Sequence, residues 1–563
     1  MINFQIVSGF RGDFLVKTFI KIKAGLLKVY QKTYFCVIIK FKMKSEIQSF
    51  KKNCKIPMIK KYLLLFVIAI FVMSCSKKVE VKGKIVGASP LERIEFVEAS
   101  GVATLPLTNI GIDKNGNFEG SFEAPKNGMY VINYAGKQSL IFLKGGQEIN
   151  ISGNAATFPN EFVVNGDAKK DNEFFQACQK FLMSYGQTLD VQSLVAGDEN
   201  NFVKAMQKIE ADLNKNIDEN QKKFNPGNDV VEWKKMDAKT AILNLMANYE
   251  INKMQTSGNP SFKVSKAFTD FENKLQEDKD KMVKMSPFYR QYLLTKLTPD
   301  FQKYATTAAK GKTDITTSEI FNQYLKTKKE MSQDTKDYLL AFVIAQADIL
   351  PQTPAKNVDK VKKIIEEDIK DKTVQEDLKK MQFAINGFKI GDDAPEASLV
   401  KADGSAYKLS ENKGKPYMLV FYASWNPYIS EGTVPVLKEV VNFYKSKMNF
   451  VYVNLDDTND QFKKTSNAMM KGIPGVNVYG EKGLNSDIAK KYGIYGFKLP
   501  NFIIVDKNGK IASRGYVNLG DPELITVLDK QTGLAAPQVN PQMQQQMQQQ
   551  MMTPEAAPAP SAK

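Results

Sequence analysis

Apolar and polar residues alternate with a period of two in the region 75–166. The alternation is clearest in two runs: Val79, Val81 and Ile85, and Tyr130, Ile132 and Tyr134. Turn sequences separate such runs at Asn115-Gly116, Asn127-Gly128 and Gly145-Gly146. Alternation places one face of a strand against a core and the other in solvent. The pattern therefore predicts a small all-β domain over residues 75–166, an antiparallel sandwich or barrel.

The apolar spacing becomes helical between residues 167 and 387. Two sets of residues three or four apart define apolar helix faces: Phe202, Met206, Ile209, Leu213 and Ile217, and Val358, Val361, Ile365 and Ile369. Helix breaks are expected at Pro226-Gly227, Pro260, Pro287, Pro299 and Pro351. We expect seven to nine helices without an internal repeat. The Lys, Asp and Glu residues on the other faces indicate a solvated exterior.

A third pattern begins near residue 388 and alternates strands with helices. Two apolar runs have the length of buried strands, Tyr417–Tyr422 and Phe450–Leu455. A helical face lies between them, formed by Val434, Leu437, Val441 and Tyr444. Such alternation predicts an α/β domain over residues 388–534, with a central sheet and helices on its faces. The whole chain is therefore expected to be a multidomain α+β protein with an all-β sandwich, a helical middle and a C-terminal α/β fold.

Gln, Met, Pro and Ala dominate the last residues, 535–563, which end in PQMQQQMQQQMMTPEAAPAPSAK. A segment with so little apolar surface cannot offset the entropy of ordering by burial. We expect this tail to be disordered, or to fold only on a partner.

Most of the net charge of +17 lies at the N-terminus. Residues 1–74 contain 14 Lys and Arg against 2 acidic residues, which leaves 64 basic and 59 acidic residues in the rest of the chain. An excess of five positive charges over so many residues gives no reason to expect binding of nucleic acid.

A secretory signal is predicted at residues 58–74. Met58-Ile-Lys-Lys61 is followed by an apolar run from Tyr62 to Met73, too short to span a bilayer, and then by Ser74 and Cys75. Val72-Met-Ser-Cys75 resembles the lipobox of bacterial lipoproteins, which implies that Cys75 is acylated and anchors the mature chain to a membrane. Because signal peptides begin close to the start of translation, we interpret residues 1–57 as a spurious N-terminal extension.

Histidine is absent from the sequence, which removes the usual general base and nearly every zinc or copper site. Asp113–Gly116 and Asp506–Gly509 have the composition of calcium loops but not their ligand spacing, so we expect hairpin turns there. Cys178 lies on an apolar helix face and is expected to be a buried, unreactive thiol. No metal site, cofactor or intramolecular disulfide is predicted.

The segment FYASWNPYISE, residues 421–431, together with Lys415-Pro416 and Leu499–Lys510, resembles the thioredoxin-like family of TlpA and ResA type, which is related to the AhpC/TSA group. The resemblance covers residues 388–530. The region with IDKNGNFEGSF, GMYVINY and LIFLKGGQEINISG resembles the domain of unknown function that precedes such domains in many bacterial lipoproteins. The first resemblance implies a thioredoxin-like fold and a Cys-x-x-Cys pair after Trp425.

This chain has Asn426 and Ile429 at the two cysteine positions, and Pro435 falls one residue later than the family spacing. Neither side chain can form a mixed disulfide, so no catalytic residue is assigned. Asn426 and Pro427 are also favoured at the start of a helix for structural reasons alone. The resemblance implies a cis bond before Pro500 and a groove that binds an extended peptide. Its candidate residues here are Trp425, Asn426, Pro427, Tyr428, Leu499 and Pro500.

Three functions fit these observations. The first is a cell-envelope lipoprotein with a redox-inactive thioredoxin-like domain that binds a peptide or partner protein. The second is the thiol-disulfide oxidoreductase or peroxiredoxin-like enzyme that the resemblance alone would suggest. The third is a tether that binds its partner through the helical middle. Resemblance to lipoproteins without Asp after the lipidated Cys75 implies the outer membrane, with the chain facing the periplasm.

Overall fold

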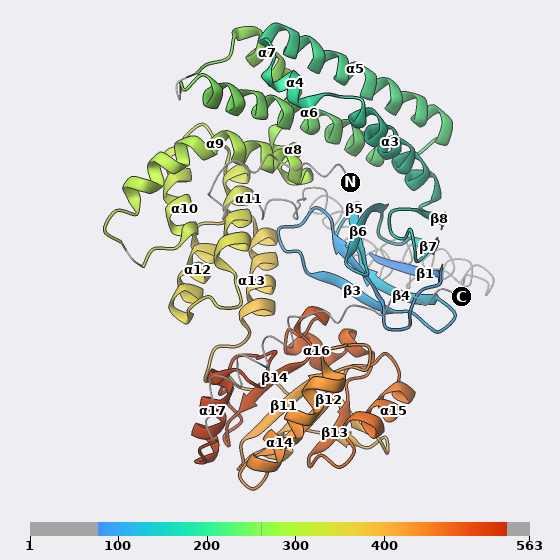
Figure 1. Cartoon of the computed structure of the whole chain (residues 1–563), viewed down its shortest axis with the longest axis vertical. Coiled ribbons are helices and arrows are strands. Elements are labelled where there is room, and N and C mark those ends of the chain that lie inside the picture. Colours follow the sequence, from blue (N-terminus) through green and yellow to red (C-terminus); the bar gives the residue numbers. More distant parts are fainter. Residues whose placement is uncertain (1–76, 260–261, 313, 537–563) are drawn as a thin grey trace, which may run out of the picture. The chain divides into compact units, whose positions relative to one another are not determined.

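The computed structural model describes residues 77–259, 262–312 and 314–536, in which β-strands come first, helices follow and an α/β sheet comes last (Figure 1). The expected mixed architecture is thereby confirmed. The chain divides into two units, the first ending at Gly387 and the second beginning at Phe388. The predicted extension, the signal, Cys75 and residues 537–563 of the tail lie outside the described residues.

Eight strands near the start of the first unit form two four-stranded sheets with the orders β4-β1-β7-β8 and β3-β2-β5-β6. They are β1 (Lys78–Val86), β2 (Arg93–Glu98), β3 (Pro106–Gly111), β4 (Asn117–Glu123), β5 (Gly128–Tyr134), β6 (Lys137–Leu143), β7 (Glu148–Asn154) and β8 (Phe162–Gly166). The expected antiparallel pairing holds except between β1 and β7, which run parallel.

The residues expected inside the sandwich are buried. Val79, Val81 and Ile85 of β1 and Tyr130 and Ile132 of β5 belong to one apolar core. The turn Asp113–Gly116 is not a hairpin within one sheet, because β3 and β4 belong to different sheets. The turn still reverses the chain, with the Gly116 N–H donating to the Asp113 carbonyl over 3.0 Å and Gly116 at φ +81°.

The described part of residues 167–387 contains eleven α-helices and one π turn, more helices than the proline pattern predicts. They are α3 (Lys169–Gln187), α4 (Val191–Ala196), α5 (Glu199–Phe224), α6 (Asn228–Thr256), α7 (Lys266–Leu275), α8 (Lys279–Met285), α9 (Pro287–Ala308), α10 (Thr317–Thr327), α11 (Gln333–Val343), η1 (Ile344–Asp348), α12 (Ala355–Glu367) and α13 (Lys372–Asn386). Short helices such as α4 and α8 raise the number. The break expected at Pro299 is wrong, since α9 continues through it.

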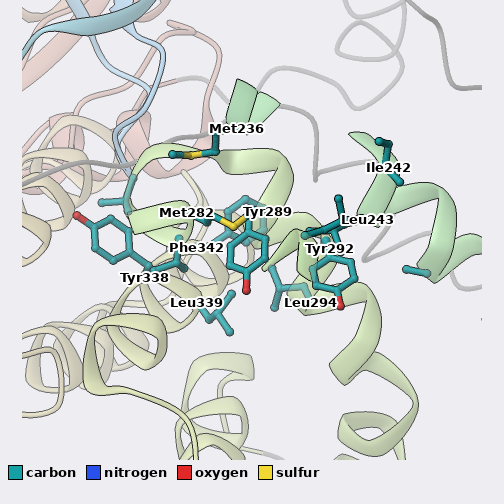
Figure 2. Close-up of a cluster of buried hydrophobic side chains, with 14 of the residues drawn as sticks. Met236, Ile242, Leu243, Met282, Tyr289, Tyr292, Leu294, Tyr338, Leu339 and Phe342 are labelled. Carbon is teal, nitrogen blue, oxygen red and sulfur yellow. The ribbon is translucent and has the colours of Figure 1, made fainter. Parts of the chain in front are cut away.

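The helices share a core with one face of the sheet β3-β2-β5-β6. Ala99, Val102, Met129 and Phe142 of the β-region belong to the same buried cluster as the helical side chains. Side chains of α6, α8, α9 and α11 belong to this cluster, among them Met282, Tyr289 and Tyr338 (Figure 2). The amide of Asn172 on α3 bonds both backbone groups of Phe142 at 2.8 Å. Helices and sandwich are therefore packed as one unit.

The second unit has a six-stranded sheet with the order β10-β9-β13-β12-β11-β14. Its strands are β9 (Leu399–Lys401), β10 (Ala406–Tyr407), β11 (Tyr417–Tyr422), β12 (Asn449–Asn454), β13 (Val476–Tyr479) and β14 (Asn501–Val505). Its helical segments are η2 (Leu409–Asn412), η3 (Ile429–Thr433), α14 (Val434–Tyr444), α15 (Asn459–Met469), η4 (Gly483–Asn485), α16 (Asp487–Lys491), η5 (Gly496–Lys498) and α17 (Pro522–Thr532).

The centre of this sheet is covered on both faces. All six residues of β11 are buried, and they alternate between two apolar cores. The first core contains Leu419 and Phe421, and the second contains Met418 and Val420. β11 is parallel to β12 and antiparallel to β14, as expected for a doubly covered sheet that ends in a hairpin. The turn Asp506–Gly509 is the predicted hairpin, because the Asp506 N–H donates to the Lys510 carbonyl at 2.8 Å.

Candidate functional site

The altered motif lies at one end of the sheet of the second unit. Residues 423–428 follow the end of β11, and the loop 495–500 precedes the start of β14. Phe421 pairs with Asn501 across these two strands, so both segments meet at the same sheet end. The Leu499–Pro500 bond is cis, as the family resemblance implied.

Asn426 joins the two segments. Its side chain is 5% exposed, and its Nδ2 donates to the Leu499 carbonyl over 3.0 Å. Its Oδ1 accepts the Tyr428 N–H at 2.9 Å, the capping bond that Asn favours at a turn. The Leu499 N–H donates to the Gly496 carbonyl at 3.3 Å. Both backbone groups of the residue before the cis proline are therefore already bonded within the chain.

Ile429 fills the second cysteine position with a core side chain. It is fully buried and packs in the apolar core that also contains Met418, Tyr422 and Leu437. Burial of a branched aliphatic side chain contributes about 1.5–3 kcal/mol. At this position the chain gains packing where the family resemblance implies a thiol.

The late position of Pro435 has a structural counterpart. The segment Ile429–Thr433 is a π turn, and the α-helix begins only at Val434 with Pro435 in its first turn. A π turn holds one residue more than an α-turn, so it accommodates an inserted residue within a helix. The Thr433 hydroxyl donates to the Tyr428 carbonyl at 2.5 Å and supports this wider turn. The extra residue is absorbed before α14, and Leu437 and Val441 of α14 still reach the core.

The buried carboxylate of Asp456, which the sequence did not point to as a site residue, holds the backbone at the start of the same turn. Asp456 is fully buried and accepts from the Ser424 N–H at 2.7 Å and from the Ser424 hydroxyl at 2.8 Å. The Asn454 amide donates to it at 2.9 Å and the Thr465 hydroxyl at 2.7 Å. Asp456 thereby fixes the backbone just before Trp425. Its signal in the sequence is a pair of polar residues, Asn454 and Asp456, at the end of a buried strand.

Four of the six predicted groove residues are buried. Trp425, Asn426, Leu499 and Pro500 lie inside, while Pro427 and Tyr428 are exposed. Tyr428 is 73% exposed, and two further apolar residues at this sheet end, Phe497 and Val517, are each 57% exposed. Val517 follows Tyr516, whose backbone pairs with Phe502 next to the cis-proline segment. We name the three exposed residues Tyr428, Phe497 and Val517 the site rim. That the six predicted residues form a peptide-binding groove stays a prediction.

Phe497 lies between an aromatic ring and a cationic side chain. The ring of Phe497 stacks on Tyr495 with centroids 5.6 Å apart. Burial lowers the pKa of the neighbouring Lys498 to about 8, so its amine is still mostly protonated at pH 7. The Lys498 Nζ donates to the Gly493 carbonyl at 3.4 Å.

Other chemistry is limited within the described residues. Cys178 is a free, buried thiol of the first unit, and burial raises its pKa to about 11, which keeps it protonated and unreactive. No group of three or more acidic or Cys side chains is placed to hold a metal ion anywhere in residues 77–536 that the structure describes. Among the same residues, none of the helices has the length and apolar character needed to cross a bilayer.

The second unit is similar to known proteins. Residues 414–511 match a family model described as thioredoxin-like. A rice protein (Oryza sativa subsp. japonica) named Probable nucleoredoxin 2 is 25% identical over 138 residues, which are 24% of this chain and 33% of that protein. The chain thus spans about a third of the length of this curated relative.

Solved structures match the same region. The C-terminal domain of a protein from Bacteroides thetaiotaomicron named as a thiol-disulfide oxidoreductase is 31% identical, with a TM-score of 0.23. The match covers 26% of this chain and 97% of that domain. The thioredoxin domain of a thiol-disulfide oxidoreductase from Bacteroides vulgatus is 23% identical with a TM-score of 0.23, over 26% of this chain and 99% of that one.

Proposed function

We propose, from the premise that this chain contains a thioredoxin-like domain, that the domain binds a partner protein without exchanging electrons and that the chain is a lipid-anchored protein of the cell envelope. The observation that carries the proposal is the hydrogen bond from Asn426 Nδ2 to the Leu499 carbonyl. It replaces a reactive group with a fixed contact at the centre of the site.

Thiol chemistry supports the absence of redox activity. Disulfide exchange needs a thiolate that attacks and a second thiol that resolves the mixed disulfide. The two motif positions hold an amide and a hydrocarbon, and the thiol of Cys178 is buried in the first unit. Oxidoreductase activity is the alternative, since it is named for the matched relatives, but none of the described residues of this chain supplies its nucleophile.

The manner of binding follows from the backbone bonds of Leu499. An extended peptide would pair with the N–H and carbonyl of this residue, and both are already bonded. Contact through side chains needs no such displacement, and the site rim offers two aromatic side chains and one aliphatic side chain. Exposed aromatic side chains are frequent centres of protein interfaces. We therefore assign binding to Tyr428, Phe497 and Val517 rather than to the backbone.

The proposed location rests on the sequence. Residues 58–74 have the features of a lipoprotein signal, and acylated Cys75 would hold the mature chain at a membrane. We place the protein at the outer membrane, facing the periplasm. Metabolic labelling with a radioactive fatty acid tests the anchor: wild type should incorporate label and Cys75→Ala should not. Equal labelling of both would contradict the lipid anchor.

A reductase assay tests the redox part of the proposal. The purified full-length chain should not accelerate reduction of insulin by dithiothreitol. The matched control is the double variant Asn426→Cys, Ile429→Cys, which restores both sulfurs on the same scaffold and should show weak activity. Turnover by the wild-type chain would overturn the proposal, and a folded double variant whose thiols cannot be joined by mild oxidant would show that the motif is misaligned.

Cross-linked cell envelopes test the binding part. The variant Tyr428→Ala, Phe497→Ala should lose the proteins that co-purify with wild type, while Phe443→Ala should retain them. Phe443 is also exposed, at 40%, but lies near the opposite end of α14 from the site. If the same proteins are captured by the rim variant and by a chain that lacks residues 388–563, the partner binds the helical middle instead.

A further inference from the structure

Arg290, near the start of α9, is a buried cation whose hydrogen-bond donors are unused. Its side chain is 0% exposed, and each of its three guanidinium nitrogens lacks an acceptor among the described residues. Native proteins satisfy nearly all buried polar side chains with protein groups, water or ions. We propose that Arg290 is the centre of an anion-binding site that takes one small monovalent anion of the size of chloride. The site belongs to the first unit and does not depend on the proposed function.

The aromatic ring beside Arg290 does not replace an acceptor. The Arg290 Cζ lies 5.4 Å from the centre of the Tyr338 ring. A ring face attracts positive charge, but it offers no lone pair to the five N–H donors of a guanidinium. An anion supplies both the acceptor and the opposite charge, whereas a water molecule supplies the acceptor alone.

The nearest carboxylate is already paired with another cation. Glu98, at the end of β2, forms an ion pair with Lys126, whose Nζ also donates to the Ser100 carbonyl at 3.4 Å. Burial lowers the pKa of Lys126, Glu98 opposes this shift, and the like charge of Arg290 adds to it. Two cations therefore lie close together and share one carboxylate.

The other charges of this region act on Lys126 rather than on Arg290. Asp377 joins Glu98 in raising the pKa of Lys126. Burial lowers the pKa of Arg290 to about 9, and the groups that counter this effect are Tyr338 and Glu98. The negative charge is thus concentrated on Lys126, which leaves the guanidinium in need of a counter-ion.

Burial limits the occupant to a small ion. Arg290 itself has no contact with solvent, whereas the side chains of Lys126 and Glu98 are 21% and 12% exposed. These two residues form the solvent side of the cluster, and an anion reaches Arg290 past their ion pair. A peptide or a nucleotide cannot enter a site covered in this way, but a single halide can.

An anion at Arg290 stabilises the junction of the sandwich with the helices. Glu98 and Lys126 come from the sandwich, Arg290 from α9 and Tyr338 from α11. An unfolded chain does not bring these segments together, so the anion binds the folded unit alone and stabilises it by mass action. Above the dissociation constant, a tenfold increase in the anion should raise the folding equilibrium constant about tenfold.

Urea unfolding of the full-length chain tests this linkage. The sequence has two tryptophans, and the background Trp425→Phe leaves Trp233, buried in the first unit, as the fluorescent reporter. Sodium chloride replaces sodium gluconate at constant ionic strength. The parent should unfold at higher urea as chloride rises, while Arg290→Met should lose this dependence. In gluconate alone, Arg290→Met should be at least as stable as the parent, because the uncompensated charge is gone. Equal chloride dependence in both chains overturns the proposal.

Two further substitutions should change the affinity in opposite directions. Glu98→Gln removes the competing carboxylate and should tighten chloride binding about tenfold. Lys126→Gln frees Glu98 to pair with Arg290 and should weaken chloride binding about tenfold. Lys266→Gln, which breaks an exposed ion pair with Asp270, is the control and should change nothing. A purely structural role of the cluster gives the same direction for the first two variants, and that result overturns the proposal.

Crystals grown in sodium bromide locate the anion directly. The anomalous signal of bromide should appear at the guanidinium of Arg290 and should be missing from crystals of Arg290→Met. A parent crystal without this signal, or with the Glu98 carboxylate turned onto Arg290, overturns the proposal. These outcomes leave the reductase and co-purification tests of the proposed function unaffected, because those tests concern the second unit.

Discussion

In the second unit the buried carboxylate of Asp456 accepts hydrogen bonds from Ser424, Asn454 and Thr465, whereas in the first unit the buried guanidinium of Arg290 has no hydrogen-bond acceptor among the described residues. Arg290 lies over the ring of Tyr338 instead, with its Cζ 5.4 Å from the ring centre. Burial lowers the pKa of the guanidinium to about 9, and Tyr338 and Glu98 counter this effect.

Asp456 and Arg290 differ in how the surrounding groups satisfy a buried charge. A fully bonded carboxylate fixes every donor around it, so its loss leaves several polar groups unsatisfied. A guanidinium without acceptors carries a desolvation cost in the folded state, and replacement by an apolar side chain removes that cost. We therefore expect the altered site to depend strongly on Asp456 and the first unit to tolerate the loss of Arg290.

The largest effect is expected for Asp456→Ala. The substitution leaves donors of Ser424, Asn454 and Thr465 without an acceptor, which should destabilise the second unit by about 3–5 kcal/mol. Hydrogen exchange of the β11 amides reports on this unit alone and should accelerate strongly. Asp460→Asn, an exposed acidic residue in the first turn of α15, is the control and should change little. A small effect of Asp456→Ala would remove the contrast between the two centres.

The next largest effect concerns the pH dependence of stability, through the carboxyl of Asp377. Burial, followed by Glu98, raises the pKa of Asp377 to about 6, while Lys380 and Lys126 oppose the shift. Because the folded-state pKa is above the unfolded value, the protonated carboxyl stabilises the fold at low pH, and this contribution is lost as pH rises through about 6.

Asp377→Asn should therefore stabilise the first unit by about 2–3 kcal/mol at pH 7.5 and hardly at all at pH 4. Urea unfolding at both pH values measures the difference. The exposed neighbour Glu376→Gln serves as the control. The same stabilisation at both pH values would show that the carboxyl is ionised normally in the folded chain.

A smaller effect is expected at Asn426, because its contacts are fewer than those of Asp456. Asn426→Ala leaves the Leu499 carbonyl and the Tyr428 N–H without their partners and should cost about 1–3 kcal/mol. Asn426→Asp keeps an acceptor for Tyr428 but places a carboxylate against the Leu499 carbonyl. The Tyr428 amide should therefore exchange quickly in the alanine variant and stay protected in the aspartate variant. Equal protection in both would show that Asn426 does not cap the turn.

The smallest effect is expected for Arg290→Met, which keeps a long side chain over Tyr338 and removes the charge. We expect the free energy of unfolding of the first unit to change by less than about 1 kcal/mol, or to rise. Arg290→Ala, which leaves a cavity, should be clearly worse in the same urea titration. Severe destabilisation by methionine would show that the guanidinium is bonded after all.

The sequence predicted those features that depend on local periodicity. The buried runs at 417–422 and 450–455 were placed correctly because β-strands covered on both faces consist of apolar residues. The helix faces that contain Phe202 and Val361 are buried because apolar residues three or four positions apart lie on the same side of a helix. The number of helices and the parallel pairing of β1 with β7 depend on contacts between distant segments and could not be derived from periodicity.

The candidate site could be predicted only in part. The missing cysteines and the late Pro435 were visible in the sequence, but the bond from Asn426 to Leu499 joins residues 73 positions apart. The expectation that the Lys residues of the middle region are solvated is wrong for Lys234, which is 3% exposed and paired with Asp237. A charged residue is placed inside by its tertiary neighbours, which its own position in a helical pattern does not reveal.

The π turn at Ile429–Thr433 lies between Tyr428, which belongs to the site rim, and helix α14, which packs in the core. A change of one residue in chain length between Tyr428 and Val434 alters the width of this turn and leaves the core-facing side of α14 in register. The loop that presents Tyr428 can therefore lengthen or shorten during divergence while the hydrophobic interior stays intact. A change in the exposed loop is thereby separated from the packing of Leu437 and Val441 in the core.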